Sequence, residues 1–295
     1  IKFFINSETY TFKSILQFLK RRWFRTFPNY YFFLIINIVL VYLNWIPGKV
    51  NENTAVYFGF MQNVYQPFDL FFWESWSLVI EEWFYPIVPI VLVVSFYVFR
   101  KKFKAKRCFL LTTIALIILP TLYRLFSYSP DLDWDLYFRK LVLTRMDTIG
   151  FGLLVAYLQV YHFNFFNKHR YWTFAIGLGL YIFTSIYLKT WSHQFQCVFF
   201  FTATAVGVSL MFPALYSWKS ERIPFKPFRF VSLISYSVYL IHLPIYYLTI
   251  SWYEGASLSM TIFYYFTYWV MVFVGAYLVY RFFEKPMMEL RDRIK

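Results

Sequence analysis

The sequence predicts an all-α fold, a polytopic bundle of transmembrane helices. Of its 295 residues, 60% are hydrophobic and 26% are aromatic, whereas only 15% are charged, a composition typical of membrane proteins rather than soluble domains. Apolar runs of about 20 residues, the length that crosses a bilayer, recur along the chain. Basic residues gather in every second loop, as the positive-inside rule requires. This bias accounts for the net charge of +14, and we expect no nucleic-acid partner.

Eight apolar runs are visible, and each predicts one transmembrane helix. The run that begins at residue 146 is the weakest of them. No internal repeat, low-complexity linker or soluble appendage separates the runs, so we expect one membrane-embedded domain over residues 1–295. The runs cover residues 28–46, 79–99, 108–125, 146–161, 171–188, 196–216, 231–250 and 260–282.

Successive loops are alternately rich and poor in lysine and arginine, and this pattern predicts the orientation of the chain in the membrane. The loops between the basic segments are poor in lysine and arginine and contain several acidic residues instead, and this assigns the basic segments to the cytoplasm. We therefore expect a multi-pass protein of the plasma (inner) membrane, surrounded by membrane lipids, with both ends of this chain in the cytoplasm. The basic segments are residues 20–25, 100–107, 168–170, 219–229 and 285–295.

The two cysteines begin predicted helices on opposite sides of the membrane. Cys108 lies at the cytoplasmic start of the third run, and Cys197 lies at the outer start of the sixth. A disulfide needs Cα atoms within roughly 7 Å of each other, so we expect no bridge. Neither cysteine has a partner at metal-ligand spacing, and we expect no metal site.

The stretch Trp76–Pro86 places two adjacent carboxylates at the head of an otherwise apolar run. An ionisable side chain inside a membrane span costs about 2.5–3.5 kcal/mol and is by default a candidate functional residue. Ser77, Glu81 and Tyr85 are spaced to share one helical face, whereas Glu82 lies on another. Glu81, Glu82 and Ser77 are therefore candidate site residues.

An alternative leaves these glutamates in the outer headgroup zone. Trp76, Trp83 and Tyr85 would then form an aromatic belt at the membrane interface. The spacing alone favours neither interpretation.

A histidine lies deep in the seventh predicted helix. Ser235, Tyr239 and His242 share one face there, and His242 is about 16 Å from the start of the run, close to the bilayer midplane. One interpretation is a neutral buried histidine that a serine or tyrosine hydroxyl satisfies. The other is a functional role, because histidine is well suited to proton transfer at neutral pH.

The fourth predicted helix opens with two charged residues and two glycines. Arg145 and Asp147 could form an ion pair that anchors a helix end, which is the commoner role of such residues. Gly150 and Gly152 would let a neighbouring helix or a ligand approach closely.

Three arginines precede the first predicted helix. Arg22 and Arg25 are one turn apart at the cytoplasmic edge, and Arg21 is next to them. Most such residues only set the orientation of the chain. Paired guanidinium groups, however, also suit bidentate binding of phosphate.

Several separated motifs, taken in order, resemble one family: the acyltransferase 3 family of multi-pass membrane O-acyltransferases. Any one motif alone would be weak, but the ordered set covers nearly the whole chain and is fairly specific. The motifs are RRxxRxxPxYY at Arg21–Tyr31, WSLxxEExFYP at Trp76–Pro86, RxDxxxxGxLxA at Arg145–Ala156, SYSxYLxHxP at Ser235–Pro244 and FxEKP at Phe282–Pro286.

The resemblance implies ten transmembrane helices, of which about eight are visible here. The two that should precede the arginine motif include the histidine generally regarded as the catalytic base of the family. Because the chain begins with Ile1 rather than methionine, we expect missing upstream sequence, and we expect this segment alone to be inactive.

The resemblance also implies the chemistry, which is transfer of an acyl group, usually acetyl, from acyl-CoA to a hydroxyl of a cell-surface or lipid-linked saccharide. Acetyl-CoA is then a donor substrate, and no cofactor is bound. The family comparison implies that Arg22 and Arg25, helped by Arg21, bind the acyl-CoA. The outer position of the glutamates suits the acceptor side.

We expect supporting catalytic roles for three further residues. Glu81 would orient the missing histidine or the acceptor, and Arg145 would form an ion pair or stabilise the oxyanion. His242 would make a second polar contact. Further site candidates are Trp76, Ser77, Glu82, Asp147 and Tyr239.

A rival function from another class is a transporter or flippase for a lipid-linked saccharide or an anionic solute. Membrane-embedded charges and a basic inner face are equally expected there. Gly/Pro-broken helices in symmetric halves would favour it, and the sequence shows no such halves.

Overall fold

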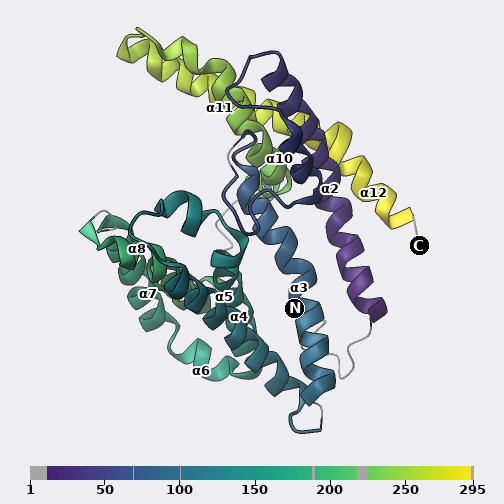
Figure 1. The fold of residues 1–295 in the computed structure, drawn as a ribbon, viewed down its shortest axis with the longest axis vertical. Helices are drawn as coiled ribbons and strands as arrows, with labels where there is room; N and C mark the ends of the chain where they lie inside the picture. The colour runs from purple at the N-terminus through teal and green to yellow at the C-terminus, as the bar shows by residue number, and fades with distance from the viewer. Residues whose placement is uncertain (1–11, 69, 100, 188–189, 218–224, 294–295) are drawn as a thin grey trace. The chain divides into compact units, whose positions relative to one another are not determined.

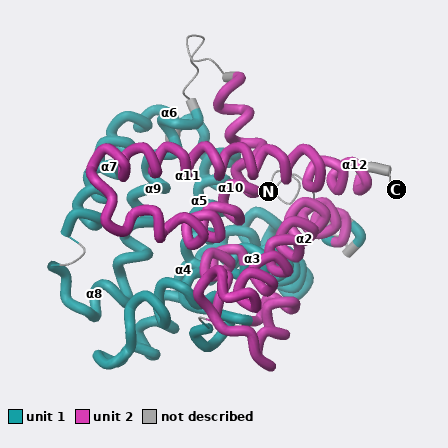
Figure 2. The backbone as a smooth tube through the Cα atoms, turned by 90° about the horizontal axis from the view of Figure 1, so that it is seen from above, with its two compact units in different colours: residues 1–15, 62–68, 79–220 teal, residues 16–61, 69–78, 221–295 magenta. Residues whose placement is uncertain are grey.

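The computed structural model describes residues 12–68, 70–99, 101–187, 190–217 and 225–293, and over these ranges it is helical without a β-strand (Figure 1). The predicted all-α fold is confirmed. The chain groups into two compact units, drawn in two colours in Figure 2: unit 1, residues 1–15, 62–68 and 79–220, and unit 2, residues 16–61, 69–78 and 221–295. The expectation of one domain over the whole chain stays a prediction.

Unit 1 is built around an apolar core shared by its first three long helices. Side chains of α3, α4 and α5 interdigitate in this core, which excludes water from their common face. The core residues are Phe84, Val88, Leu92, Phe109, Leu116, Leu153 and Tyr157. The helices of the unit are α3 (Ser75–Phe99, from Val79 on), α4 (Ala105–Ser127), η2 (Trp134–Arg139), α5 (Val142–Tyr161), α6 (Phe163–Lys168), α7 (Arg170–Ile186), α8 (His193–Val198) and α9 (Phe200–Ser217).

Glycines let helices of unit 1 approach closely. A Cβ atom on Gly177 of α7 would lie 2.5 Å from the carbonyl oxygen of Gly207 on α9, so only glycine fits this contact. Gly150 of α5 lets α4 approach in the same way, because a Cβ atom on it would lie 3.1 Å from the Ile117 side chain of α4. Gly152 faces open space, so the predicted close approach holds for Gly150 alone.

Unit 2 combines the N-terminal helix with the C-terminal helices. Its core is aromatic: the rings of Tyr30 and Phe60 stack at 4.1 Å, and the Tyr30 hydroxyl donates to the Tyr57 carbonyl at 2.9 Å. The Tyr57 hydroxyl in turn donates to the Phe71 carbonyl at 2.8 Å. The helices of the unit are α2 (Phe12–Tyr42), η1 (Glu52–Gly59), α10 (Phe225–Thr249), η4 (Ile250–Tyr253), α11 (Leu258–Val279), η5 (Tyr280–Glu284) and α12 (Lys285–Arg293).

The first helix begins well before the apolar run that predicted it. Helix α2 starts at Phe12 and includes Pro28, whereas the run starts near residue 28. Residues 12–27 contain no glycine or proline and are rich in good helix formers. Pro28 removes only one backbone donor. The arginines of the first motif therefore lie inside a helix rather than in a connecting segment.

Five described helices are long and apolar enough to cross a membrane, and the chain is a multi-pass membrane protein. The other three predicted runs are helical too, but α7 has only 17 residues, and Phe199 separates α8 from α9 within the sixth run. A helix of 17 residues spans about 26 Å, less than the roughly 30 Å of a bilayer core. The five are Ile15–Tyr42, Ser75–Phe99, Ala105–Ser127, Lys226–Tyr253 and Leu258–Arg291.

Both cysteines are buried and free. Cys108 lies in the first turn of α4, and Cys197 lies in α8. The prediction that they form no disulfide is confirmed.

Candidate active site

A buried polar network in unit 2 joins three of the motifs found in the sequence. The Asn29 side-chain amide donates to Glu284 Oε2 at 2.8 Å and to Ser237 Oγ at 3.3 Å, and Ser237 Oγ donates to the same Glu284 oxygen at 2.8 Å. All three residues are almost fully buried. Hydrogen bonds to a charged acceptor are stronger than neutral ones, so this network fixes how α2 and α10 are rotated against the C-terminal segment.

The arginine motif lies directly beside this network on α2. Arg25 precedes Asn29 by one turn, about 6 Å along the helix axis, and Arg22 precedes it by two. Arg21 and Arg25 are exposed, and Arg22 is half-buried. The Tyr236 hydroxyl of α10 donates to the Thr26 carbonyl at 3.1 Å. The predicted phosphate-binding side chains are therefore held on a helix whose position is set by buried contacts.

A second polar group in unit 2 brings Ser77 and Tyr239 together. Their side-chain oxygens lie 2.5 Å apart, and the Tyr239 hydroxyl donates to the Glu74 backbone carbonyl at 2.7 Å. Because the single tyrosine proton goes to Glu74, the hydroxyl proton of Ser77 points at the tyrosine oxygen. Two candidate site residues from separate motifs, Ser77 and Tyr239, are therefore in contact. Trp76, the residue before Ser77, is half-buried.

Glu74 is an acidic residue that the sequence reasoning did not place at the site. Its side chain is 4% exposed, and no described residue hydrogen-bonds its Oε1. Burial raises the pKa of Glu74 to about 8 because desolvation disfavours the charged carboxylate. The available signal was its position directly before the Trp76–Pro86 motif.

His242 continues the same side of α10 one turn beyond Tyr239. Its Nδ1 lies 2.6 Å from the Tyr239 backbone carbonyl, and a carbonyl can only accept, so Nδ1 carries the proton. The neutral ring then presents Nε2 as an acceptor. The partner of His242 is thus a backbone carbonyl rather than the serine or tyrosine hydroxyl considered from the sequence, and the ring is half-buried.

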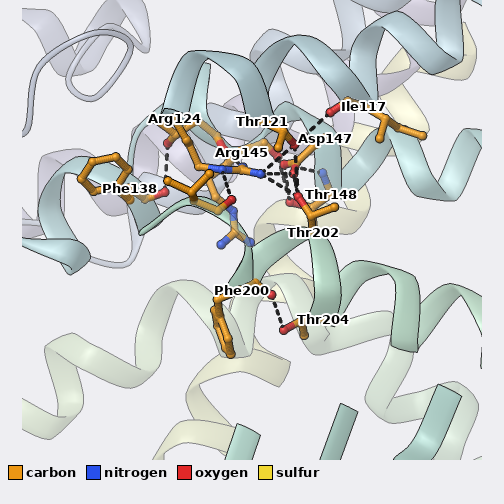
Figure 3. Close-up of polar contacts among 12 residues, drawn as sticks. Ile117, Thr121, Arg124, Phe138, Arg145, Asp147, Thr148, Phe200, Thr202 and Thr204 are labelled. Atoms are coloured by element: carbon orange, nitrogen blue, oxygen red, sulfur yellow. Dashed lines mark hydrogen bonds and ion pairs between the residues drawn. The ribbon is translucent and has the colours of Figure 1, made fainter. Parts of the chain in front are cut away.

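Unit 1 contains a buried ion pair around Arg124 (Figure 3). Arg124 Nη2 lies 2.7 Å from Asp147 Oδ2, and both side chains are fully buried. The second oxygen of Asp147 accepts from the backbone N–H of Thr148 at 2.9 Å. Arg124 Nε donates to the Val198 carbonyl and Nη1 to the Thr144 carbonyl, and the hydroxyls of Thr121 and Thr202 also lie within hydrogen-bond distance of Nη2.

This geometry shows that Asp147 pairs with Arg124 rather than with Arg145. Residues at i and i+2 do not face each other on a helix, so Arg145 and Asp147 diverge. The sequence signal for Arg124 was a charge near the end of the third apolar run. This buried network joins α4, α5, α8 and α9 and points to a structural role for Asp147.

Arg145 is left with a different environment. Its guanidinium carbon lies 4.1 Å from the centre of the Phe201 ring, a cation–π contact, and no described residue hydrogen-bonds its Nε. The guanidinium is therefore positioned by stacking on Phe201, and its Nε–H remains available to a ligand. This arrangement suits binding of an anion or of a developing negative charge.

The two adjacent glutamates of α3, which lie past its first turn, differ in environment. The Tyr85 hydroxyl donates to Glu81 Oε1 at 3.0 Å, as their predicted position on one helical face requires. Glu81 is half-buried, whereas Glu82 is only 7% exposed. Both belong to unit 1 with Arg145 and Asp147, whereas Ser77, Tyr239, His242 and the three arginines belong to unit 2.

Comparison with known proteins identifies a family but no individual relative. The family model described as an acyltransferase domain matches residues 3–281, nearly the whole chain. The match spans most of both units and includes the arginine motif, the Trp76–Pro86 motif, Arg145 and His242. No curated protein and no solved structure matches the chain.

Proposed function

Because the chain belongs to the acyltransferase 3 family, we propose that it is an integral membrane O-acyltransferase that moves an acetyl group from cytoplasmic acyl-CoA to a hydroxyl of a cell-surface or lipid-linked saccharide. The observation that carries the proposal is the match of one acyltransferase model across residues 3–281. The polar groups of both units supply residue types that this chemistry requires.

The reaction forms one bond and breaks another. The acceptor oxygen attacks the thioester carbonyl carbon, the new C–O bond forms, and the C–S bond breaks. The proton lost by the acceptor hydroxyl ends on the departing sulfur, so the products are the saccharide ester and free CoA thiol. The step needs a proton acceptor at the hydroxyl and positive charge or donors at the carbonyl oxygen.

Arg22 and Arg25 are our candidates for binding the phosphates of the acyl-CoA, with Arg21 contributing charge. Guanidinium groups bind phosphate through paired N–H donors. The exposure of Arg21 and Arg25 suits a large, soluble nucleotide ligand. The buried contacts of Asn29 one turn away support the proposal, because they hold α2 in a fixed rotation.

His242, Tyr239 and Ser77 are our candidates for contacts to the acceptor in unit 2. With Nδ1 donating to a carbonyl, His242 Nε2 can accept a hydrogen bond from the acceptor hydroxyl. The Ser77–Tyr239 contact holds the tyrosine ring beside the imidazole, and the two ring centres lie 5.7 Å apart.

Arg145 and Glu81 are our candidates in unit 1. Arg145 is a half-buried cation with an Nε donor that no described residue satisfies, and this supports a role in stabilising the thioester oxyanion. Glu81 accepts from Tyr85 and would orient an acceptor hydroxyl or the catalytic histidine. We assign both residues supporting roles.

Release of CoA thiol tests the function. The protein is expressed from its complete open reading frame, purified, and supplied with acetyl-CoA and lipid-linked saccharide. We expect thiol release only when both substrates are present, and Arg25→Ala should raise the KM for acetyl-CoA about tenfold. The matched control is Lys49→Ala in a predicted outer loop. Saccharide movement across vesicles without any thiol release would instead establish a transporter.

We also propose a location in the plasma membrane with the arginine motif on the cytoplasmic side. The alternating basic segments support this orientation. Reporter fusions at Glu52 and Lys104 should report opposite compartments, and the same compartment at both sites would overturn the topology.

A further inference from the structure

Unit 1 contains a cavity lined by residues of α5, α7 and α9 and by the two histidines that flank α6. Its volume is about 230 Å³, and its wall is made almost entirely of carbon atoms. This volume lies below the roughly 300–1,000 Å³ of sites that enclose a drug-sized ligand. The shape therefore suits part of an apolar chain rather than a whole saccharide. Most of the wall is formed by Phe151, Leu154, Leu158, Val206, Leu210 and Pro213.

Two histidines line one end of this cavity. His162 follows the last residue of α5, and His169 precedes the first residue of α7, so they flank the short helix α6 on both sides. His162 is exposed, and we take the end that the two histidines line as the mouth of the cavity. The exposed Lys168 is the last residue of α6, and Arg170 is the first residue of α7. Groups that can carry positive charge therefore lie at the mouth and next to it in the sequence.

The same end of unit 1 carries further basic residues. Lys106, in the first turn of α4, places its Nζ 4.3 Å from the centre of the Tyr161 ring at the end of α5. Lys106, from the basic segment 100–107, thus lies near the end of α5, from which α6 leads to the basic segment 168–170. Anionic lipid headgroups are attracted to such juxtamembrane clusters by about 1 kcal/mol per basic residue.

Exposed aromatic side chains accompany these charges. Tyr171 and Trp172, in the first turn of α7, are 71% and 75% exposed, and the Arg170 guanidinium lies 4.7 Å from the centre of the Tyr171 ring. Exposed tyrosine and tryptophan beside basic residues are typical of the membrane–water interface. This pattern favours a position of the mouth at headgroup level.

We propose that this cavity binds one acyl chain of an anionic membrane phospholipid, whose phosphate is held at the mouth by His162, His169 and Lys168. An apolar cavity excludes water and accepts apolar ligands, and the bilayer around the protein supplies acyl chains. The basic mouth selects an anionic headgroup over a zwitterionic one. The site goes beyond the proposed acyl transfer, and none of its residues has a role in that reaction.

Thermal unfolding of the delipidated protein tests the proposal. The protein, expressed from its complete open reading frame, is measured with phosphatidylglycerol or with phosphatidylcholine of the same acyl chains. We expect phosphatidylglycerol, at about 100 times its dissociation constant, to raise the Tm by about 5 °C, with a smaller rise for phosphatidylcholine. Native mass spectrometry should show one tightly retained phosphatidylglycerol.

Two kinds of variant assign the effect to this cavity. Val206→Trp fills the cavity and should abolish the phosphatidylglycerol shift, whereas Val160→Trp, at an exposed position of α5, should retain it. Leu154→Phe fills less of the cavity and replaces Val206→Trp in this experiment if that variant does not fold. Lys168→Ala should reduce the difference between the two lipids, and Lys49→Ala should leave that difference unchanged.

Three results would overturn the proposal. One is an unchanged shift in a folded cavity-filling variant, and another is an equal shift with both phospholipids. The third is stabilisation by palmitoyl-CoA but not by phosphatidylglycerol, removed by Val206→Trp, because the cavity would then take the acyl chain of a CoA donor. Thiol release by the wild-type protein is measured separately, so failure of the lipid site is distinguishable from failure of the proposed enzyme.

Discussion

The side chain of Asn29 donates a 2.8 Å hydrogen bond to the carboxylate of Glu284, although 255 positions separate the two residues. The contact links the helix that carries the arginine motif to the segment that ends the chain's last long apolar helix. Ser237 of α10 completes the connection through the same oxygen. One carboxylate therefore fixes three elements of unit 2, and the proposed phosphate-binding arginines depend on it indirectly.

Replacing Glu284 should disturb both stability and donor binding. In Glu284→Ala, the hydroxyl of Ser237 loses its acceptor and the amide of Asn29 keeps only Ser237, and leaving a buried donor unsatisfied costs about 1–3 kcal/mol. We expect a lower Tm and a KM for acetyl-CoA raised about tenfold, because α2 can then rotate. The control is Glu289→Ala, whose carboxylate is exposed and pairs weakly with Lys285 at 3.7 Å. A lower Tm with an unchanged KM would limit Glu284 to stability.

The Arg124–Asp147 pair should matter mainly for folding. Asp147→Ala leaves a buried guanidinium without its counter-charge, and breaking a buried pair typically costs about 3–5 kcal/mol. We expect a large loss of folded protein, measured as the fraction that remains monodisperse in detergent after heating. Arg145→Ala removes only a stacked cation, so it should fold and lose acyl transfer. Equal loss of folding in both variants would contradict this division of roles.

Sequence patterns predicted local features well because these depend on spacing along one helix. The apolar runs located the helices, and the i, i+4 spacing placed Tyr85 against Glu81. Partners from different helices could not be predicted, because their pairing depends on how helices pack. Asp147 pairs with Arg124 across α4 and α5 for this reason, whereas closeness in the sequence had suggested Arg145. Glu284 and Asn29 likewise meet only through the fold.

The Ser77–Tyr239 contact should be detectable as an energetic coupling. Ser77→Ala and Tyr239→Phe each remove a partner of one short hydrogen bond, so the double variant should be less impaired than the sum of the two single variants. We expect each single variant to lose about tenfold in kcat/KM, with a coupling near 1 kcal/mol, measured by thiol release. The control is Tyr246→Phe at an exposed position of α10. Strict additivity would show that the contact does not serve catalysis.

The raised pKa of Glu74 predicts how stability depends on pH. Burial raises the pKa of this carboxyl from 4.5 to about 8, so between these values the folded protein holds a proton that the unfolded chain has released. Stability should therefore fall as the pH rises from about 5 to 8, since the folded state binds more protons over this range. Glu74→Gln keeps the neutral form at every pH and should flatten the decline in Tm. A decline as steep in Glu74→Gln as in the wild-type protein would assign the pH dependence to other groups.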